Sequence, residues 1–177
     1  MAIIAKAGSG GDFTPCPEGP QRLVCCDVID LGLVEVTWQG ETKRQHKCEI
    51  RWQSEHVMDS GKPFLINQRF TLSLHEKGRL RPVLEAWRGR KFTEQEAEGF
   101  DIEKLVSVSA YGNVVHNKGS KGGTFANLAS IMPLPKGLES LRVSDYMRVV
   151  DREPMSLHEQ GHAVDDVPAI TDDDIPF

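Results

Sequence analysis

The spacing of apolar residues changes twice along the chain, and this change limits the folds open to it. Residues 23–38 are a β-type run rich in Val, Ile and Leu, and apolar residues follow the two-residue period of half-buried strands over 46–53 and, more loosely, over 65–74. Within 80–87 they fall at i, i+3, i+4 and i+7, which places them on one face of a helix. The two-residue period returns over residues 106–132. The sequence therefore predicts a mainly β protein with a helical insert.

Three strand segments precede the insert, at residues 23–38, 46–53 and 65–74. Gly32 interrupts the first of them, which predicts a bulge or bend. In the second segment apolar and charged residues alternate, so they occupy opposite faces of the strand. The apolar face consists of Cys48, Ile50 and Trp52, and the charged face of Lys47, Glu49 and Arg51.

After the insert a glycine-rich turn at 117–123 joins two further strands. Within the insert, Gly89 ends the first helix, and Thr93 with Glu96 forms a capping box that starts a second. Five strands with a helix between the third and the fourth are the layout of an OB-fold barrel. Residues 137–150 fit either a helix or a last strand.

The composition divides the chain into four segments. Residues 1–20 are rich in glycine and proline, which indicates a flexible arm. Residues 21–150 hold the strands and helices of the OB-fold domain. Residues 151–171 lack apolar periodicity and carry acids and prolines, so we expect a disordered acidic linker. Residues 172–177 form a separate tip.

The net charge of -5 conceals an asymmetry between the body and the tail. Residues 151–177 contain eight Asp or Glu and one Arg, whereas residues 43–91 contain twelve Lys or Arg and five Asp or Glu. Aromatic residues interleave with these cations. A basic body with interleaved aromatics is typical of nucleic-acid binding, although the net charge alone argues against it.

The cysteines indicate a reducing compartment. No C-x-x-C pair occurs among the four cysteines, so the spacing gives no support for a metal site such as Cys16, Cys48 and His46. Cys25 and Cys26 are adjacent in a strand segment, so we expect one in the core and the other exposed. With neither a signal peptide nor a membrane-spanning run, the chain is expected in the cytoplasm of a bacterium or of a phage host.

The last residues form a short motif of three aspartates followed by an apolar tripeptide: Asp172, Asp173, Asp174, Ile175, Pro176 and Phe177. This motif resembles the C-terminal tip of bacterial single-stranded DNA-binding proteins (SSBs). Phe177 can fill an apolar pocket of a partner while the aspartates and the terminal carboxylate meet basic residues at its rim. The alternative is a tail that only solubilises the protein, but solubility does not require the apolar residues.

The body resembles a group of phage and prophage proteins of the OB-fold, SSB type. The resemblance lies in residues 86–94, 99–105 and 124–131. It implies a protein without enzymatic activity or cofactor that protects single-stranded DNA in replication, recombination or repair. The partners implied are replication, recombination and repair proteins that recognise SSB tips. No membrane partner is expected, and the oligomeric state stays open, a homodimer included.

Binding of single strands without sequence preference needs cations for phosphates and aromatic faces for bases. The candidates lie on the second and third strands and in the hairpin: Lys43, Arg44, Lys47, Arg51, Trp52, Arg69, Phe70, Tyr111, Lys118 and Lys121. His116, Phe125 and Trp38 are further candidates. Core packing is an alternative for three of the rings, those of Trp52, Phe70 and Phe125.

Two other interpretations of the protein's function remain open from the sequence. His158-Glu159-Gln160-Gly161-His162 matches the H-E-x-x-H motif of zinc metalloproteases. Gly161 and the flanking Pro154 and Pro168 disfavour the helix that this motif requires. The second alternative is an adaptor or decoy that engages SSB-tip partners without binding DNA, and the basic central segment argues against it.

Overall fold

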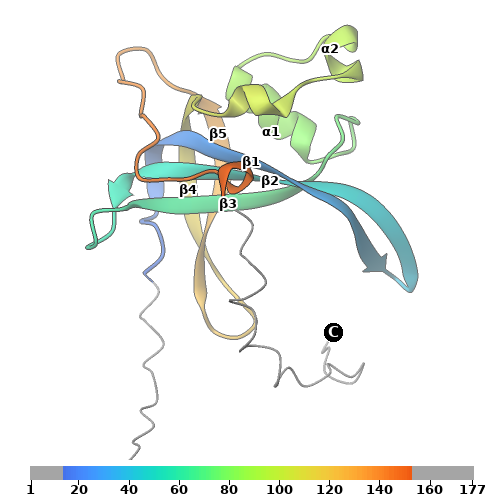
Figure 1. The fold of residues 1–177 in the computed structure, drawn as a ribbon, viewed down its shortest axis with the longest axis horizontal. Coiled ribbons are helices and arrows are strands. Elements are labelled where there is room, and N and C mark those ends of the chain that lie inside the picture. Colours follow the sequence, from blue (N-terminus) through green and yellow to red (C-terminus); the bar gives the residue numbers. More distant parts are fainter. Residues whose placement is uncertain (1–13, 153–177) are drawn as a thin grey trace, which may run out of the picture.

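Five antiparallel strands form one sheet in the computed structural model, which describes residues 14–152 (Figure 1). The strands are β1 (Gly19–Trp38), β2 (Glu41–Val57), β3 (Pro63–Thr71), β4 (Ser109–Lys118) and β5 (Thr124–Pro133), in the order β3-β2-β1-β4-β5. Two helices, α1 (Leu80–Arg88) and α2 (Glu94–Glu98), and a 3-10 turn, η1 (Ile102–Leu105), lie between β3 and β4. The predicted succession of strands and helices is confirmed.

The hairpin of β1 and β2 extends well beyond the rest of the sheet (Figure 1). Gln39 and Gly40 form its two-residue turn with φ of 50° and 80°, the left-handed geometry that matches the twist of a hairpin. The ladder of β1 with β4 covers only Gly19–Val24, and the ladder of β2 with β3 begins at Lys47. Residues 32–46 therefore form a two-stranded ribbon, which we call the arm.

Two bulges interrupt β1. The bulge predicted at Gly32 is confirmed, because the pairing with β2 shifts between Asp30 and Gly32, whose φ is 68°. A second shift falls between Cys25 and Asp27. This bulge breaks the alternation of faces, so Cys25 and Cys26 are both buried. The expectation that one of these two cysteines is exposed is therefore wrong.

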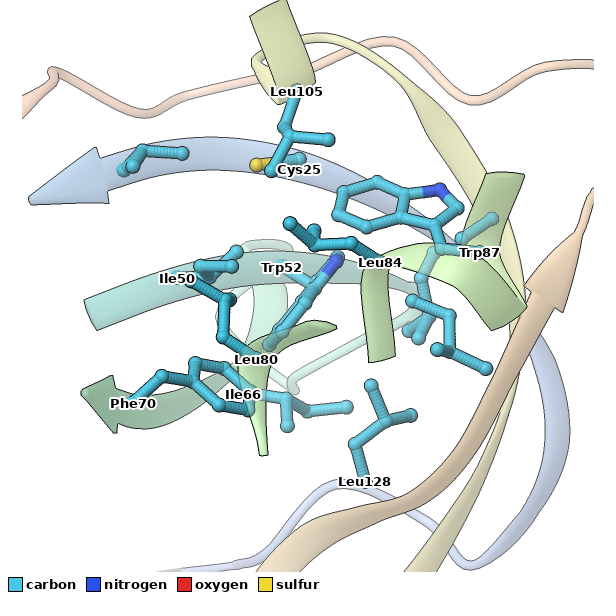
Figure 2. Close-up of a cluster of buried hydrophobic side chains, with 14 of the residues drawn as sticks. Cys25, Ile50, Trp52, Ile66, Phe70, Leu80, Leu84, Trp87, Leu105 and Leu128 are labelled. Atoms are coloured by element: carbon cyan, nitrogen blue, oxygen red, sulfur yellow. The ribbon is translucent and has the colours of Figure 1, made fainter. Parts of the chain in front are cut away.

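The hydrophobic core lies between the sheet and α1 (Figure 2). The indole rings of Trp52 from β2 and Trp87 from α1 meet with their centroids 5.8 Å apart. The apolar face predicted for the helix is buried, with Leu80 and Leu84 beside Trp87. The Nε1 atom of Trp87 donates to the carbonyl of Ser109 at 3.1 Å, which fixes α1 to the start of β4.

The sheet is not closed into a barrel. Within residues 14–152 no hydrogen-bonded ladder joins β3 to β5, the two outer strands of the sheet. Helix α1 lies at this opening, where a hollow of about 270 Å³ is lined by Gln68 of β3, Val83 of α1 and Leu128 of β5. Side chains of the helix thus pack where a closing ladder would run.

The ends of the described chain differ from expectation. Strand β1 begins at Gly19, because its first residues pair with β4, so the ordered body starts before residue 21. Residues 137–150 form neither a helix nor a strand, apart from a 3-10 turn, η2 (Val149–Asp151). Three parts of the chain lie outside the described residues: residues 1–13 of the expected flexible N-terminal segment, the linker after residue 152, and the tip. No helix within 14–152 is long and apolar enough to cross a membrane.

Candidate nucleic-acid interface

Strands β2 and β3 place three cations on the outer face of the sheet, which faces away from the core. Trp52 and its alternate neighbours in β2 are buried in the core, so Lys43 and Lys47 lie on the opposite face. Glu49 belongs to the same outer row, and its cross-strand partner on β3 is Arg69. Because directly opposed residues share a face, these three cations lie on one face of the sheet and its arm.

The arm adds an exposed indole to this face. Val36 of β1 is the cross-strand partner of Lys43, and Trp38 follows it on the same face. A shallow hollow of about 420 Å³ is lined by Val36, Trp38 and Lys43 together with neighbouring polar residues. Trp38 is 75% exposed. We call Trp38, Lys43, Lys47 and Arg69 the outer strip.

The lysines of the outer strip form only weak contacts within the protein. Lys43 Nζ lies 3.1 Å from the Glu41 carboxylate, but both side chains are more than 70% exposed, and such surface pairs contribute little. Lys47 Nζ donates to Thr71 Oγ1 at 2.8 Å. This bond to a neutral hydroxyl orients the ammonium group, and no carboxylate within residues 14–152 forms an ion pair with it.

Arg69 shares a buried carboxylate with Arg51. The Nε atoms of Arg51 and Arg69 donate to the two oxygens of Glu49 at 2.7 and 2.8 Å. Burial alone raises the pKa of Glu49, but the hydrogen bonds and charges of the two arginines outweigh it and hold this pKa below its usual value. One negative and two positive charges leave a net positive site, at which the exposed side chain of Arg69 faces solvent.

A segment from the far end of the body covers the remaining outer face. This segment, residues 137–152, crosses β1 and β2 beyond the outer strip, and we call it the strap. The side-chain amide of Gln53 both donates to the Ser144 carbonyl at 2.6 Å and accepts from the Ser144 amide at 3.0 Å. The side chain of Gln53 thereby pairs with the backbone of Ser144 as a neighbouring strand would do in a sheet.

Asp27 anchors the strap to β1. Its carboxylate is buried and accepts hydrogen bonds from Tyr146 Oη at 3.0 Å, Arg148 Nε at 3.1 Å and the Val149 amide at 2.8 Å. Burial raises the pKa of Asp27, but these donors outweigh it and keep this pKa below its ordinary value. Arg148 also forms two bonds to Glu103, at 2.9 and 2.8 Å.

The strap contacts two further predicted DNA-binding residues. Arg51 lies against it, with Nη1 donating to Tyr146 Oη at 3.2 Å. Tyr111 of β4 lies in a hollow whose other walls include Leu138 and Glu139 of the strap. Both side chains are partly buried, so the strap leaves only part of each exposed.

Three predicted assignments require correction. Trp52 and Phe70 are buried in the core, where their rings pack on apolar neighbours and are inaccessible to a nucleobase (Figure 2). Arg44 lies on the face of the arm opposite Lys43, because adjacent residues of a strand point in opposite directions. There it pairs with Glu35 at 3.3 Å.

The tip of the β4–β5 hairpin carries the remaining predicted cations, Lys118 and Lys121, both exposed. Phe125 follows on β5 and is 50% exposed, so it does not fill the interior of the sheet. A groove of about 520 Å³ runs between this hairpin and the turn from β2 to β3, with Phe125 and Leu65 in its walls. His116 is occupied elsewhere, since its Nε2 lies 2.7 Å from the Cys16 carbonyl.

The strap anchors and the groove were not predicted from the sequence. A buried aspartate in a strand is a signal for a hidden cationic partner, but nothing in the sequence pairs Asp27 with Arg148. Leu65 gave a clearer signal. It lies between Phe64 and Ile66, which are buried, so strand alternation alone places it as an apolar residue on the outer face.

No metal site is found within residues 14–152, where no three His, Cys, Asp or Glu side chains gather as ligands. The His158-Glu159-x-x-His162 motif and the tip lie outside the described residues. Comparison with known proteins gives no family: no family model matches the chain, and no curated protein is significantly similar to it. The function must therefore be argued from the surface itself.

Proposed function

We propose that this protein binds and protects single-stranded DNA in the cytoplasm, without strong sequence preference, during replication, recombination or repair. We also propose that its sheet is an OB-fold. The strand order β3-β2-β1-β4-β5 and the helix between β3 and β4 support this assignment. OB-folds bind oligonucleotides on the face of strands 2 and 3 and on the loops that follow strands 1 and 4.

The observation that carries the proposal is the outer strip. Lys43, Lys47 and Arg69 lie on one open face of β2 and β3, and Trp38 is exposed beside them. Cations along such a face neutralise successive phosphates, and an exposed indole stacks on a base. A duplex hides its base faces, so an aromatic platform of this kind favours a single strand.

The tip, residues 172–177, has a separate role in the proposal. Its aspartates and its apolar Ile-Pro-Phe tripeptide suit a pocket with an apolar floor and a basic rim. We propose that it recruits replication, recombination and repair proteins that recognise SSB tips. The body would then hold the strand while the tip brings an enzyme to it.

An adaptor that engages tip-binding partners without DNA is the alternative. Titration with oligo-dT over a series of salt concentrations separates the two. For an SSB, affinity falls as salt rises, with a log–log slope of about -0.7 for each phosphate contacted. An adaptor shows no binding even at low salt.

Intrinsic tryptophan fluorescence can report where on the protein the oligonucleotide binds, because the three tryptophans differ in exposure. Trp52 and Trp87 are buried, whereas Trp38 is exposed on the outer strip. We expect oligo-dT to quench the fluorescence of the native protein. In Trp38→Phe the quenching disappears, while binding measured by the anisotropy of a labelled oligonucleotide persists. Full quenching in Trp38→Phe places the strand elsewhere.

A further inference from the structure

The first strand of the arm has an unpaired edge. The ladder of β1 with β4 ends at Val24, so among the described residues 14–152 the segment 32–38 of β1 pairs with β2 alone. The arm projects from the rest of the sheet (Figure 1). An unpaired strand edge presents N–H and C=O groups with which the strand of another chain can pair.

The two edges of the arm differ in charge. Charged side chains protect an edge strand from pairing with another chain, and the β2 edge has this protection in Lys43 and Arg44. The segment 32–38 of β1 carries only one charge, Glu35, whose carboxylate lies 3.3 Å from Arg44 Nε. The large apolar residues exposed on this segment are Leu33, Val34 and Trp38. The β1 edge of the arm is therefore the one suited to pairing.

The pairing with β2 determines which backbone groups of the β1 edge point outward. Trp38 and Glu41 close the two-residue turn, and pairs along the ribbon alternate from there between those that exchange backbone hydrogen bonds and those that do not. Glu35 and Thr37 fall in pairs of the second kind, so their N–H and C=O groups point away from β2. The hydroxyls of Thr37 and Thr42 lie 3.0 Å apart, in agreement with the closer approach of side chains in such pairs.

We propose that this edge pairs antiparallel with the same edge of a second copy of this chain, about a two-fold axis at Val36. In this register Glu35 lies opposite Thr37 of the second copy, so the outward backbone groups of both strands meet. On the outer face Val34 lies opposite Trp38 of the second copy, and the two Val36 side chains oppose each other. Residues 34–38 are thus complementary to themselves, as an isologous contact requires.

Charge and geometry select this register and this occupant. A register centred on Glu35 would set two carboxylates opposite each other, and one centred on Val34 would run into the bulge at Gly32. About Val36 the two bodies lie at opposite ends of the shared ribbon, and both outer strips face the same side. The outer edges of the joined ribbon are then the charged β2 edges, which disfavour the addition of a third copy.

The pairing predicts a weak dimer, because the shared ribbon comprises only residues 34–38 of each copy and small interfaces are typical of transient complexes. Sedimentation equilibrium of the native protein without DNA, over a series of protein concentrations, measures the dissociation constant. We expect a reversible equilibrium of monomer and dimer. The measurement contains no DNA, so its result does not depend on the proposed function.

Thr37→Pro removes an outward N–H from each copy and leaves the ladder with β2 intact, since proline is tolerated where an edge N–H faces outward. The dimer then lacks two hydrogen bonds, and we expect its dissociation constant to rise by about 10- to 100-fold. Thr42→Pro is the matched control. It breaks the same hydroxyl contact but removes an N–H from the β2 edge, so it should dimerise like the native protein.

A disulfide tests the register directly, because the four native cysteines are buried. The two residues at position 36 form a non-hydrogen-bonded pair with Cα atoms about 4.5 Å apart, within the range that a disulfide bridges. We expect Val36→Cys to form a linked dimer under mild oxidation and Val34→Cys to stay unlinked. The inference is overturned if the native protein remains monomeric at every concentration, if Thr37→Pro and Thr42→Pro weaken the dimer equally, or if Val34→Cys alone is linked.

Discussion

The Nε atom of Arg148 lies 3.1 Å from the carboxylate of Asp27, and this contact joins two residues 121 positions apart in the chain. Through it the strap closes over one part of the outer face and leaves the other part open. The open part carries Lys43, Lys47 and Arg69. The open area of the outer face is therefore defined by the strap as much as by the sheet.

Replacing Asp27 by asparagine removes the charge at the centre of this anchor. In the native protein Arg148 donates to Oδ1, and Tyr146 and the Val149 amide both donate to Oδ2. Asparagine leaves one carbonyl oxygen for these three donors and places its own amide group against the others. We expect Asp27→Asn to lower the free energy of unfolding by about 2–3 kcal/mol, since hydrogen bonds to charged groups are among the stronger ones. Urea denaturation followed by circular dichroism measures this loss.

Asp30→Asn is the matched control on the same strand. The Asp30 side chain is 64% exposed, and its contact with His46 Nε2 at 2.5 Å lies at the surface. We expect a change of about 1 kcal/mol or less. Equal losses in the two variants would show that Asp27 does not anchor the strap.

Stability is expected to fall in acid because of Glu96. Hydrogen bonds from Arg90, the Thr93 amide and Arg88 lower the pKa of Glu96 from 4.5 to about 2. The unfolded chain therefore takes up a proton at Glu96 before the folded one does, and stability is lost as the pH falls from about 4.5 to about 2. Over this pH range, the urea concentration at the midpoint of unfolding should fall less steeply with decreasing pH in Glu96→Gln than in the native protein.

Glu98→Gln serves as the control for this acid effect. Glu98 is exposed and forms no ion pair with any residue between 14 and 152. Glu98→Gln should therefore show the same dependence of stability on pH as the native protein. The same flattening in Glu98→Gln would mean that the effect reflects general charge and does not depend on the Glu96 contacts.

The cysteines should be inert in the folded protein. All four are buried, and burial raises the pKa of Cys26 to about 12 and that of Cys48 to about 11. Thiolate is the reactive form, so at a pH of about 8 a thiol reagent should modify none of them. All four should react in urea. Rapid modification of any cysteine in the native protein would contradict the burial described above.

Deletion of residues 172–177 should change DNA binding as well as recruitment. We expect the three aspartates of the tip, which carry the same sign of charge as phosphate, to compete with it for the outer strip. If residues 153–171 after the strap form the flexible linker expected from the sequence, their typical span is about 24 Å, which is enough to reach the body. We expect the deletion to tighten oligo-dT binding at low salt and to abolish pull-down of partners, whereas unchanged affinity with intact pull-down would contradict both roles.

Much of the fold could be predicted from local patterns. The face of α1 and the capping box at Thr93 each depend on residues a few positions apart, and the same is true of the bulge at Gly32. The burial of Cys26 could not be predicted, because a bulge without glycine leaves no local signal. The strap could not be predicted either, because its contacts with Asp27 and Gln53 link residues about a hundred positions apart.

The candidate site could be predicted only in part. Strand alternation places Lys47 and Trp52 on opposite faces of β2, and the structure confirms this. Alternation also places Lys43 and Arg44 on opposite faces, although both were predicted as DNA-binding cations. Whether an aromatic ring is buried depends on what packs above the strand. For this reason Trp52 and Phe70 could not be distinguished from Trp38 and Phe125 before the position of α1 was known.

In the proposed function, Lys43, Lys47 and Arg69 hold the phosphates of a single strand. The most direct test is the salt dependence of oligo-dT binding by a variant with all three changed to glutamine, beside Arg44→Gln as a control on the opposite face of the arm. Loss of three phosphate contacts predicts a log–log slope shallower by about 2 in the triple variant. Arg44→Gln should keep the native slope. A native slope in the triple variant would contradict the account.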